Sequence, residues 1–531
     1  MKRAHHSQVF AVLARTIGHV LLIGDILRRR ARGPDADRTA LVFREHTWTY
    51  GELNSAATRL ANGLIGLGVR RGDRVALLGR NSVEWVVAYF AAAKAGAILV
   101  PVSFWYKSAE LQHVLADSGT AILIASVDHA EVVGEAIDAL APQPRVVWIG
   151  DAAAGLTTAE LIASSSDVES DSGVRETDPH VILYTSGTTG APKGAVLSHR
   201  AHVLHAATWA AETRAEREDT YLCTYPLFHT GGTDCGILPP LYRGARVVVL
   251  PWPDADAILD AIERHRVTAF RAVPTIWKRL MAHPDIGRRD LSSLRRVIAG
   301  SDAMPRELIE QIRQRIPRAA YLQNYGLTEA GPVLTFLRPE DPPSTYGSNG
   351  LPHPQAEIRI VSGDGTVLPS GVVGEIVART EHVMEGYWNL PERTADALRD
   401  GWLHTGDLGY LDRQGYLWVT GRMKDVIITG SEHVYPAEIE SILLLHPAVA
   451  EVAVIGVPDS TWGESVAAIV VPATGTSPSA DDLIAFVRSR VADFKRPRYV
   501  VFADELPRTG PTRKVQKAAL RERYRELARA G

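Results

Sequence analysis

The sequence has little cysteine, almost no net charge and no long apolar run. Its 531 residues include only two cysteines, Cys223 and Cys235, which excludes a disulfide framework, and their spacing matches no zinc motif. A reducing, cytoplasmic environment is therefore expected. The formal net charge of -3 gives no reason to expect nucleic acid as a partner. No apolar stretch approaches the roughly 18 residues that a membrane-spanning helix needs, so we predict no transmembrane segment.

Three common enzyme motifs are also missing. The chain has no G-x-S-x-G nucleophile for an α/β-hydrolase, and no G-x-G-x-x-G follows a strand near the start, as a Rossmann dehydrogenase would require. The ATP-binding loop G-x-x-x-x-G-K-[ST] is absent as well. Counted from Gly187, Pro192 stands at the second glycine position and Gly194 follows the lysine.

A phosphate-binding loop of another type is present instead. The stretch YTSGTTGAPKGA, from Tyr184 to Ala195, combines glycines, hydroxyl side chains and one lysine. Glycines let backbone N–H groups approach a ligand closely, hydroxyl groups add donors, and Lys193 adds a mobile positive charge. This composition predicts that the loop holds a phosphate chain.

The length and the order of the patterns predict an α/β protein with at least two domains. A chain of 531 residues exceeds the size at which one hydrophobic core stops growing. From Thr47 on, helical segments such as 49–69 alternate with strand-like segments such as 73–79, which indicates largely parallel sheets. Shorter β-like pieces follow Gly350, and a compact α+β unit of roughly a hundred residues follows from Lys424.

Three other segments are assigned structural roles. Residues 9–27 are apolar but interrupted by charges, so we expect an amphipathic helix packed on the protein body, with attachment to a membrane surface or an acyl-chain partner as the alternative. His199, His202 and His205 recur every three residues on a predicted helix, but no carboxylate completes a metal-ligand set, so structural histidines are expected. The polar residues 154–178 are predicted to form a surface connection.

Four further motifs follow the loop in a fixed order along the chain. They are YGLTEAG at 325–331, WLHTGDLGY at 402–410, GRMKDVIITGSEHVYPAEIE at 421–440 and LPRTGPTRKVQKAAL at 506–520. Together with the loop, they resemble the adenylate-forming superfamily, which includes acyl-CoA synthetases, amino-acid adenylation domains and firefly luciferase. The resemblance extends from Thr39 to Leu520. It implies a large N-terminal domain of α/β subdomains with a small β-rich subdomain at residues 1–421, and a small mobile α+β domain at 422–531.

The family activates a carboxylate by attack on the α-phosphate of ATP, which releases pyrophosphate and leaves an acyl-adenylate. Cationic and hydrogen-bonding groups must neutralise the charge that develops. In this chain, Thr328 would contact phosphate, and Glu329 would hold Mg²⁺ with Thr185 as a weaker second ligand. By the same resemblance, six loop residues would bind the β- and γ-phosphates: Thr185, Ser186, Gly187, Thr188, Thr189 and Lys193.

The resemblance also implies the contacts to adenosine. Tyr325 would lie against the adenine and Asn324 would bond its edge. Asp407 would bind both ribose hydroxyls, a bidentate task suited to a carboxylate, and Arg422 would reach the same sugar. A second adenine wall is expected from Ala299–Pro305, which includes Gly300 and Ser301.

The C-terminal domain would contribute to both half-reactions. Lys514 matches the lysine that contacts the carboxylate and the α-phosphate during adenylation. The domain would then turn about a hinge at Lys424, withdraw Lys514 and bring the TGSEHVYP loop close for transfer to CoA. In that loop Ser431 and His433 are candidate CoA or phosphate contacts, and a purely structural role is the alternative for His433.

One segment distinguishes among the relatives. Amino-acid adenylation domains carry Asp after the Phe in YPLFHTGG to pair the substrate ammonium, whereas this chain has Phe228 followed by His229. His229 matches the gate beside the carboxylate in acyl-CoA synthetases. The acid is expected to be bordered by Tyr225, Phe228, His229, Trp277, Gly300 and Gly326.

The last motif departs from the family pattern. Arg513 stands immediately before Lys514, where relatives place glycine, and the loop is one residue longer. The following KVQKAALR anchors the register, with Lys517 as the alternative catalytic lysine.

The sequence therefore predicts an ATP- and Mg²⁺-dependent acid–CoA ligase that acts on a small organic acid through an acyl-adenylate. One alternative is a free-standing adenylating enzyme that loads a carrier-protein thiol. Another is an adenylate former with a different acceptor, like luciferase, or with a non-carboxylate oxyanion such as nitrite, like diazotases. A catalytically silent scaffold is disfavoured by the intact set of Lys193, Glu329, Asp407, Arg422 and Lys514.

Overall fold

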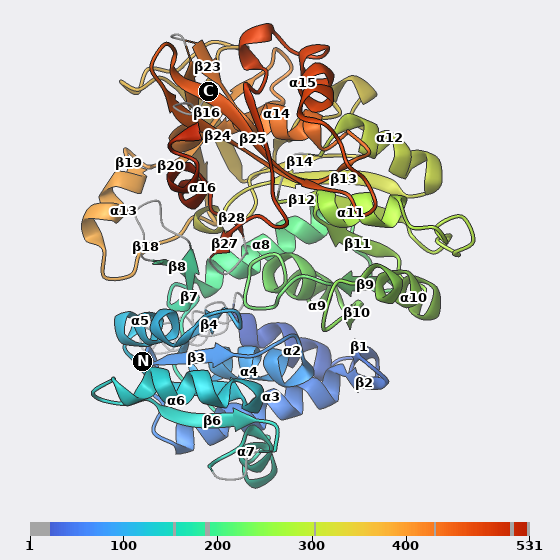
Figure 1. The fold of residues 1–531 in the computed structure, drawn as a ribbon. Coiled ribbons are helices and arrows are strands. Elements are labelled where there is room, and N and C mark those ends of the chain that lie inside the picture. The colour runs from blue at the N-terminus through green and yellow to red at the C-terminus, as the bar shows by residue number, and fades with distance from the viewer. Residues whose placement is uncertain are drawn as a thin grey trace, which may run out of the picture.

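Two large, mainly parallel β-sheets form most of the N-terminal part of the chain, and a smaller α+β domain follows (Figure 1). The computed structural model describes residues 22–151, 155–185, 192–301, 304–429, 432–509 and 514–527. The predicted fold class is confirmed, because α/β subdomains, a small antiparallel β-subdomain and a C-terminal α+β domain are all present.

The first sheet has seven strands and carries the predicted phosphate loop at one side. Five strands are parallel, and β8 and β18 add antiparallel pairs at the edge. In spatial order the strands are β18 (Gly386–Tyr387), β8 (Lys193–Ser198), β7 (Pro179–Thr185), β4 (Ile98–Val102), β3 (Arg74–Leu78), β5 (Thr120–Ser126) and β6 (Arg145–Ile149).

The second sheet has nine strands, of which six neighbours run parallel. In spatial order they are β15 (Leu351–Pro352), β14 (Thr335–Leu337), β13 (Ala320–Tyr325), β12 (Arg296–Gly300), β11 (Ala269–Ala272), β9 (Thr220–Cys223), β10 (Arg246–Val249), β1 (Thr39–Phe43) and β2 (His46–Thr49).

Helices connect and cover these strands. They are α2 (Ile23–Ala31), α3 (Tyr50–Gly66), α4 (Val83–Ala95), α5 (Ser108–Ser118), α6 (Ala130–Asp138), α7 (Thr158–Ser164), α8 (His199–Glu212), α9 (Leu238–Arg243), α10 (Ala255–His265), α11 (Pro274–Met281) and α12 (Arg306–Arg315). Short turns of helix occur at η1 (Val127–His129), η2 (Thr233–Ile237), η3 (Thr328–Ala330) and η4 (Pro343–Thr345), of which η2 is a π-helix.

Local signals fix the helices that pack on the first sheet. α3 begins at a capping box in which Thr49 and Glu52 satisfy each other's backbone N–H groups. α4 begins at Ser82, whose hydroxyl accepts from the N–H of Trp85, and ends at Gly96, where φ is 74°. The largest buried cluster joins apolar side chains of both large sheets with those of α3, α4 and α8, so the two sheets share one core.

The small β-subdomain follows the second sheet. It contains β16 (Ala356–Val361), β17 (Gly374–Thr380), β19 (Leu398–Arg399), β20 (Trp402–Leu411) and β21 (Leu417–Arg422), all antiparallel, with α13 (Pro391–Ala397).

The C-terminal domain has its own sheet and its own hydrophobic cluster. After η5 (Met423–Asp425) come β22 (Ile427–Thr429), β23 (Glu432–Val434), α14 (Pro436–Leu443), β24 (Val449–Asp459), β25 (Gly463–Pro472), α15 (Ala480–Arg488), η6 (Asp493–Lys495), β26 (Tyr499–Phe502), β27 (Arg508–Thr509), β28 (Lys514–Val515) and α16 (Lys517–Arg523).

The structure describes all or part of two segments to which the sequence assigned structural roles. The segment 154–178 contains a helix, α7, that the polar composition had concealed; a Thr157–Glu160 capping box begins it. Of the apolar segment 9–27, only the end lies within the described residues, where Ile23, Ile26 and Leu27 of α2 are buried.

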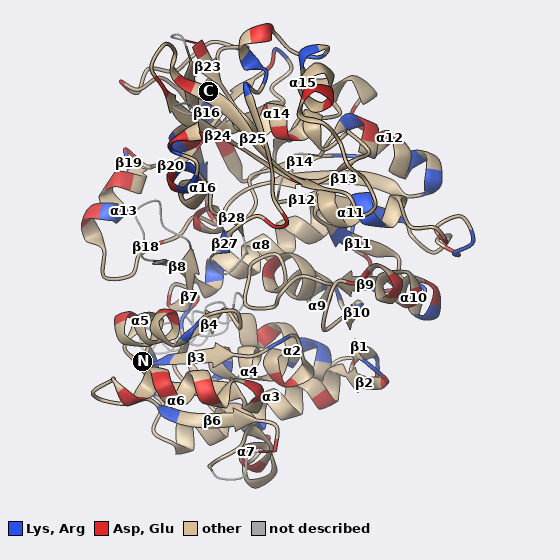
Figure 2. Cartoon of the chain, viewed as in Figure 1, with Lys and Arg blue, Asp and Glu red and all other residues tan. Residues whose placement is uncertain are grey.

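The described residues include no helix long and apolar enough to cross a membrane. Charged residues of both signs are distributed over the two domains (Figure 2).

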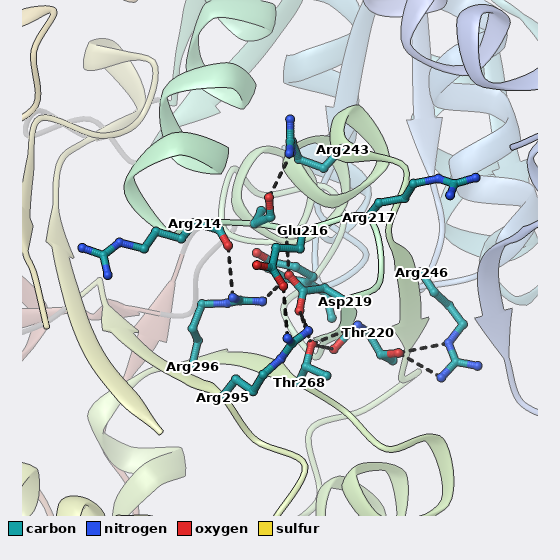
Figure 3. A network of polar contacts seen from close by, with 12 residues as sticks. Arg214, Glu216, Arg217, Asp219, Thr220, Arg243, Arg246, Thr268, Arg295 and Arg296 are labelled. Atoms are coloured by element: carbon teal, nitrogen blue, oxygen red, sulfur yellow. Dashed lines mark hydrogen bonds and ion pairs between the residues drawn. The ribbon is translucent and has the colours of Figure 1, made fainter. Parts of the chain in front are cut away.

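A buried carboxylate fastens the amino ends of three parallel strands (Figure 3). Asp219, which precedes β9, pairs with Arg296 at the start of β12 and with Arg295, whose Nη2 lies 2.6 Å from Oδ1. The hydroxyl of Thr268, just before β11, donates to the same oxygen at 2.7 Å. Because these partners satisfy the buried charge, they hold the amino ends of β9, β11 and β12 in register.

Buried histidines of α8 and of neighbouring segments form a row in the protein interior. The rings of His180 and His199 lie 4.7 Å apart, and those of His353 and His382 stack at 5.0 Å. Burial lowers their pKa values, to about 4 for His199 and His353 and to about 2 for His382, so these side chains are neutral near pH 7. No group of three or more His, Cys, Asp or Glu among the described residues is arranged to hold a metal ion.

Asp234 in η2 lies beside His202 and His205. Its carboxyl is 1% exposed, and burial raises its pKa to about 8. Nε2 of His202 lies 3.7 Å from Oδ2, but burial lowers the pKa of His202 to about 3. The contact therefore joins two neutral groups near pH 7 rather than an ion pair.

Asp234→Asn is expected to raise thermal stability at alkaline pH. The carboxyl pKa is about 8 in the folded chain and 3.8 in the reference state, so the unfolded chain releases its proton first. Folding stability of the wild type therefore falls as the pH rises from about 4 to 8, a loss that the neutral amide avoids. The gain in Tm should grow from about pH 5 to pH 8 and then level off.

The exposed Asp396 offers a matched control, since Asp396→Asn should leave the pH dependence as in the wild type. An Asp234→Asn effect of equal size at acidic and alkaline pH would contradict the protonation assigned to this carboxyl.

Candidate active site

The β7–β8 hairpin presents the predicted phosphate loop. Thr185 ends β7 and pairs in register with Lys193, which begins β8. A Cβ at Gly194 would lie 2.5 Å from the side chain of Ile182, so a larger residue would crowd the hairpin. Four of the predicted phosphate contacts, Ser186, Gly187, Thr188 and Thr189, lie outside the described residues.

The predicted metal ligand lies beside this hairpin. Glu329, in η3, accepts hydrogen bonds at Oε1 from Thr185 at 3.5 Å and from the hydroxyl of Tyr387 at 3.0 Å. Lys193 places Nζ 5.3 Å from the ring centre of Tyr387. Burial and the nearby Glu329 carboxylate raise the pKa of Tyr387, so its hydroxyl remains a neutral donor.

These oxygen donors fit a magnesium ion. Mg²⁺ is held in proteins by one or two carboxylates together with substrate phosphates and water, rather than by a closed protein cage. The half-buried Glu329 and the hydroxyl of Thr185 supply hard oxygen ligands next to a lysine suited to phosphate. Thr328, which begins η3, is likewise half-buried.

A second group of residues forms around Asp407. The hydroxyl of Tyr325, at the end of β13, donates to Oδ2 at 2.8 Å, and Nε of Arg422 lies 3.3 Å from Oδ1. Asp407 and Arg422 are also direct neighbours in the β20–β21 ladder. Burial and the Asp407 carboxylate raise the pKa of Tyr325 well above its usual value, so the phenol stays protonated. Each carboxylate oxygen keeps a lone pair with which it can accept from a ribose hydroxyl.

The predicted adenine wall lies at the ends of β12 and β13. Gly300 and Asn324 are paired in register, and a Cβ at Gly300 would lie 2.4 Å from Oδ1 of Asn324. Ser301 follows with φ of 74°, a conformation that is uncommon for a residue with a side chain. Gly326 must be a glycine because of the backbone, since a Cβ there would lie 2.0 Å from the carbonyl oxygen of Pro332.

The segment expected to border the acid is only partly placed as predicted. Nδ1 of His229 accepts from the N–H of Gly231 at 3.1 Å, which leaves the proton of a neutral ring on Nε2. Phe228 is buried, and its ring packs edge-on against those of Phe104 and Trp105. Trp277 was expected to border the acid, but its side chain is fully buried in a hydrophobic cluster. Its ring centre lies 5.0 Å from that of Phe270, so Trp277 belongs to the core.

The C-terminal candidates are placed unequally. The backbone of Lys514 lies in β28, paired with Thr509 of β27, while its side chain, Ser431 and the inserted Arg513 are outside the described residues. Lys424 is exposed in η5, and His433 is exposed in β23, which Figure 1 draws far from the β7–β8 hairpin. Lys517, the alternative catalytic lysine, forms an ion pair with Glu440 at 2.6 Å within the domain.

Two residues at the site were missed by the sequence analysis. Tyr387 approaches Glu329 only because β18 pairs with β8, a contact that no local pattern indicates. Arg271 contacts Asn324 and Ser301, and its signal was available: it is the one charged residue within the apolar stretch 269–274.

Comparisons with known proteins identify the family. Residues 27–388 match the model of AMP-binding enzymes, and residues 438–513 match that of the AMP-binding enzyme C-terminal domain. The chain therefore belongs to the AMP-binding enzyme family, the adenylate-forming superfamily that its motifs resemble. It is 40% identical over 498 residues to a feruloyl-CoA synthase from Amycolatopsis sp, covering 94% of this chain and 98% of that protein.

Two further similarities bear on the acceptor and on the fold. The chain is 35% identical over 533 residues to the fatty acid–[acyl-carrier-protein] ligase ScoC of Streptomyces coeruleorubidus, covering 99% of this chain and 98% of the relative. The crystal structure of the anthranilate CoA ligase AuaEII in complex with anthranoyl-AMP superposes with a TM-score of 0.90 at 31% identity, covering 96% of this chain and 98% of that one.

Tyr387→Phe is expected to weaken the use of ATP and Mg²⁺ together. Loss of the hydroxyl removes a hydrogen bond to the Glu329 carboxylate, and such charged bonds contribute about 1.5–3 kcal/mol. We expect kcat/KM for ATP to fall roughly tenfold or more and the half-saturating Mg²⁺ concentration to rise. Tyr410→Phe is the control, because its ring stacking on Trp418 survives the change. Unchanged Mg²⁺ dependence in Tyr387→Phe would exclude this positioning role.

Proposed function

We propose that the chain is an ATP- and Mg²⁺-dependent acid–CoA ligase that forms an acyl-adenylate, releases pyrophosphate and transfers the acyl group to CoA. The observation that carries this proposal is the position of one segment, Tyr325–Glu329. Its first residue donates to the Asp407 carboxylate, and its last lies beside Thr185 and Tyr387 at the phosphate hairpin. One short segment thereby connects the proposed ribose contact with the proposed metal and phosphate contacts.

Each side chain then has a distinct task in adenylation. Asp407 and Arg422 would hold the ribose, and the Lys193 ammonium would stabilise charge on the phosphates. Bound Mg²⁺ would neutralise phosphate charge from the side of Glu329. His229, with its proton on Nε2, would donate to the carboxylate that is activated. Lys514 would approach the carboxylate and the α-phosphate as a point charge on a flexible stem.

Rotation of the C-terminal domain would separate the two half-reactions. We place the domain boundary between residues 421 and 422 and the hinge at Lys424. The strands support a hinge at Lys424, since β21 ends at Arg422, one residue past the proposed boundary, and β22 begins the C-terminal sheet at Ile427. In the alternate orientation the loop that contains Ser431 and His433 would face CoA.

The acceptor and the acid are the finer parts of the proposal. CoA is the proposed acceptor because a relative at 40% identity is named a feruloyl-CoA synthase. A separate carrier protein is the second candidate, favoured by the similarity to ScoC. Activation of another oxyanion such as nitrite, or transfer to a non-thiol acceptor, remains a distinct outcome of the test. We propose a cytoplasmic location from the scarcity of cysteine.

Mass spectrometry of products from ATP, Mg²⁺, CoA and a panel of acids tests this function. We expect acid-dependent AMP and pyrophosphate in equal amounts together with a new acyl-CoA. AMP or a bound adenylate without thioester would favour a carrier protein, tested by adding a phosphopantetheinylated carrier. The absence of acid-dependent AMP with every acid would contradict the proposal.

Lys514→Ala should lower the rate of adenylation by at least about a hundredfold, while sparing thioester formation from supplied acyl-adenylate. The matched variant Lys517→Ala removes the neighbouring lysine, which is already paired with Glu440, and should retain adenylation. Both half-reactions are measured separately, by pyrophosphate release and by acyl-CoA formation. Loss of adenylation in Lys517→Ala with retention in Lys514→Ala would show that the register around Arg513 is wrong.

A further inference from the structure

A buried arginine lies in the second sheet beside the candidate site. Arg271 belongs to β11, which runs between β9 and β12 (Figure 1). The residue is 8% exposed, and its three strand neighbours Ala269, Phe270 and Ala272 are fully buried. Arginine stays protonated even in a protein interior, so this strand carries a permanent positive charge into the core.

Within the described residues, the guanidinium contacts only neutral groups. Nε donates to Oδ1 of Asn324 at 3.3 Å, and Nη2 donates to the hydroxyl of Ser301 at 3.1 Å. The guanidinium carbon lies 4.6 Å from the ring centre of Tyr225 and 5.7 Å from that of Trp209. These groups satisfy part of the donor capacity and supply attraction from the ring faces, but no negative charge.

No carboxylate of the described residues forms an ion pair with Arg271, and Nη1 has no hydrogen-bond partner among them. The other buried arginine among the described residues is paired: Arg296, one strand away and 7% exposed, contacts Asp219. The half-buried Arg338 likewise contacts Glu212 at 2.7 Å. A buried charge without a counter-ion is costly, so its retention points to a ligand that supplies the missing anion.

The unpartnered nitrogen faces the segment that follows His229. A Cβ built on Gly231 would lie 3.3 Å from Nη1, and one built on Gly300 would lie 2.8 Å from Nη2. The N–H of Gly231 in turn donates to Nδ1 of His229. Arg271 therefore lies between Gly300, which we place along the acid, and Gly231, which follows His229, and a side chain at either position would crowd it.

We propose that Arg271 binds a second carboxylate of the acid substrate, so that the enzyme prefers dicarboxylic acids. The inference rests on the proposed function. One carboxylate would be activated beside His229, and the other would complete the hydrogen-bonding capacity of the guanidinium at Nη1. A carboxylate fits because guanidinium and carboxylate match in charge and in planar geometry. Acids with an uncharged end would leave the buried charge unpaired and bind more weakly.

The test compares matched acids with the wild-type enzyme. Linear diacids from malonate to suberate are each paired with their monomethyl ester and with the monoacid of equal chain length, and acid-dependent AMP formation gives kcat/KM. At least one diacid should exceed both of its partners by about tenfold or more. If no acid yields AMP, the proposed function itself fails; if acids are activated without a preference for the diacid in any pair, only the present inference fails.

Variants of Arg271 separate its possible roles. Arg271→Met should remove the diacid preference, lowering kcat/KM for the preferred diacid about tenfold more than for its matched monoacid, and Arg271→Lys should retain part of the preference. An equal loss for diacids and monoacids in Arg271→Met would mean that Arg271 binds the carboxylate that is activated, which overturns the inference. If the variant does not fold, the wild-type comparison still decides.

Asp302, which follows Ser301 and lies outside the described residues, provides the last control. If Arg271 has no protein counter-ion, Arg271→Met should keep or raise Tm in the absence of acid, and Asp302→Asn should leave the diacid preference intact. A lowered Tm in both single variants that is not additive in the double variant would identify Asp302 as the counter-ion and contradict the proposal.

Discussion

The parallel alignment of four neighbouring strands is the constraint on which the candidate site depends. Because β9, β11, β12 and β13 run in the same direction, their carboxyl ends meet at one edge of the nine-stranded sheet. Tyr225, Arg271, Ser301 and Tyr325 lie at or just beyond these ends. The Asp219 network fastens the amino ends of three of the strands, so the structural charges and the proposed ligand-binding residues lie at opposite ends of the strands.

Three buried ionisable residues of this domain differ in how their charge is compensated. Asp219 is compensated by two arginines and a hydroxyl, and it therefore serves as a fixed point of the fold. Asp234 has only the neutral His202 as an ion-pair candidate among the described residues and loses its charge instead, since burial raises its pKa to about 8. Arginine cannot follow the second course at any accessible pH. Arg271 has no counter-ion among the described residues, and we propose that a ligand compensates its charge, which is why its position at the carboxyl ends of the strands matters.

Much of the site could be predicted because its residues lie in contiguous motifs. The sequence placed Thr185 and Lys193 on one loop and Tyr325 and Glu329 on one turn, and the predicted sheets and the small C-terminal domain are confirmed. The contacts that the sequence did not predict arise from pairings between segments that are distant in the chain. Tyr387 reaches Glu329 through the β18–β8 ladder, and Trp277, an aromatic residue near a motif, turns into the core against Phe270. Spacing along the chain carries no information on either contact.

The Asp407–Arg422 pair joins the proposed nucleotide site to the proposed hinge. Arg422 is the last residue of β21 and contacts the carboxylate that would hold the ribose, while Lys424 follows two positions later in the connection to β22. A ribose bound by Asp407 would change the strength of the bond from Arg422, and would thereby change the restraint on the residues that we propose to rotate. Lys278 donates to the carbonyl oxygens of Leu444 and Val449 at 2.6 and 2.8 Å, which opposes rotation from the other side of the boundary. Domain rotation would thus require these two carbonyl contacts to break, and the occupancy of the ribose site would set how firmly the hinge is held when they do.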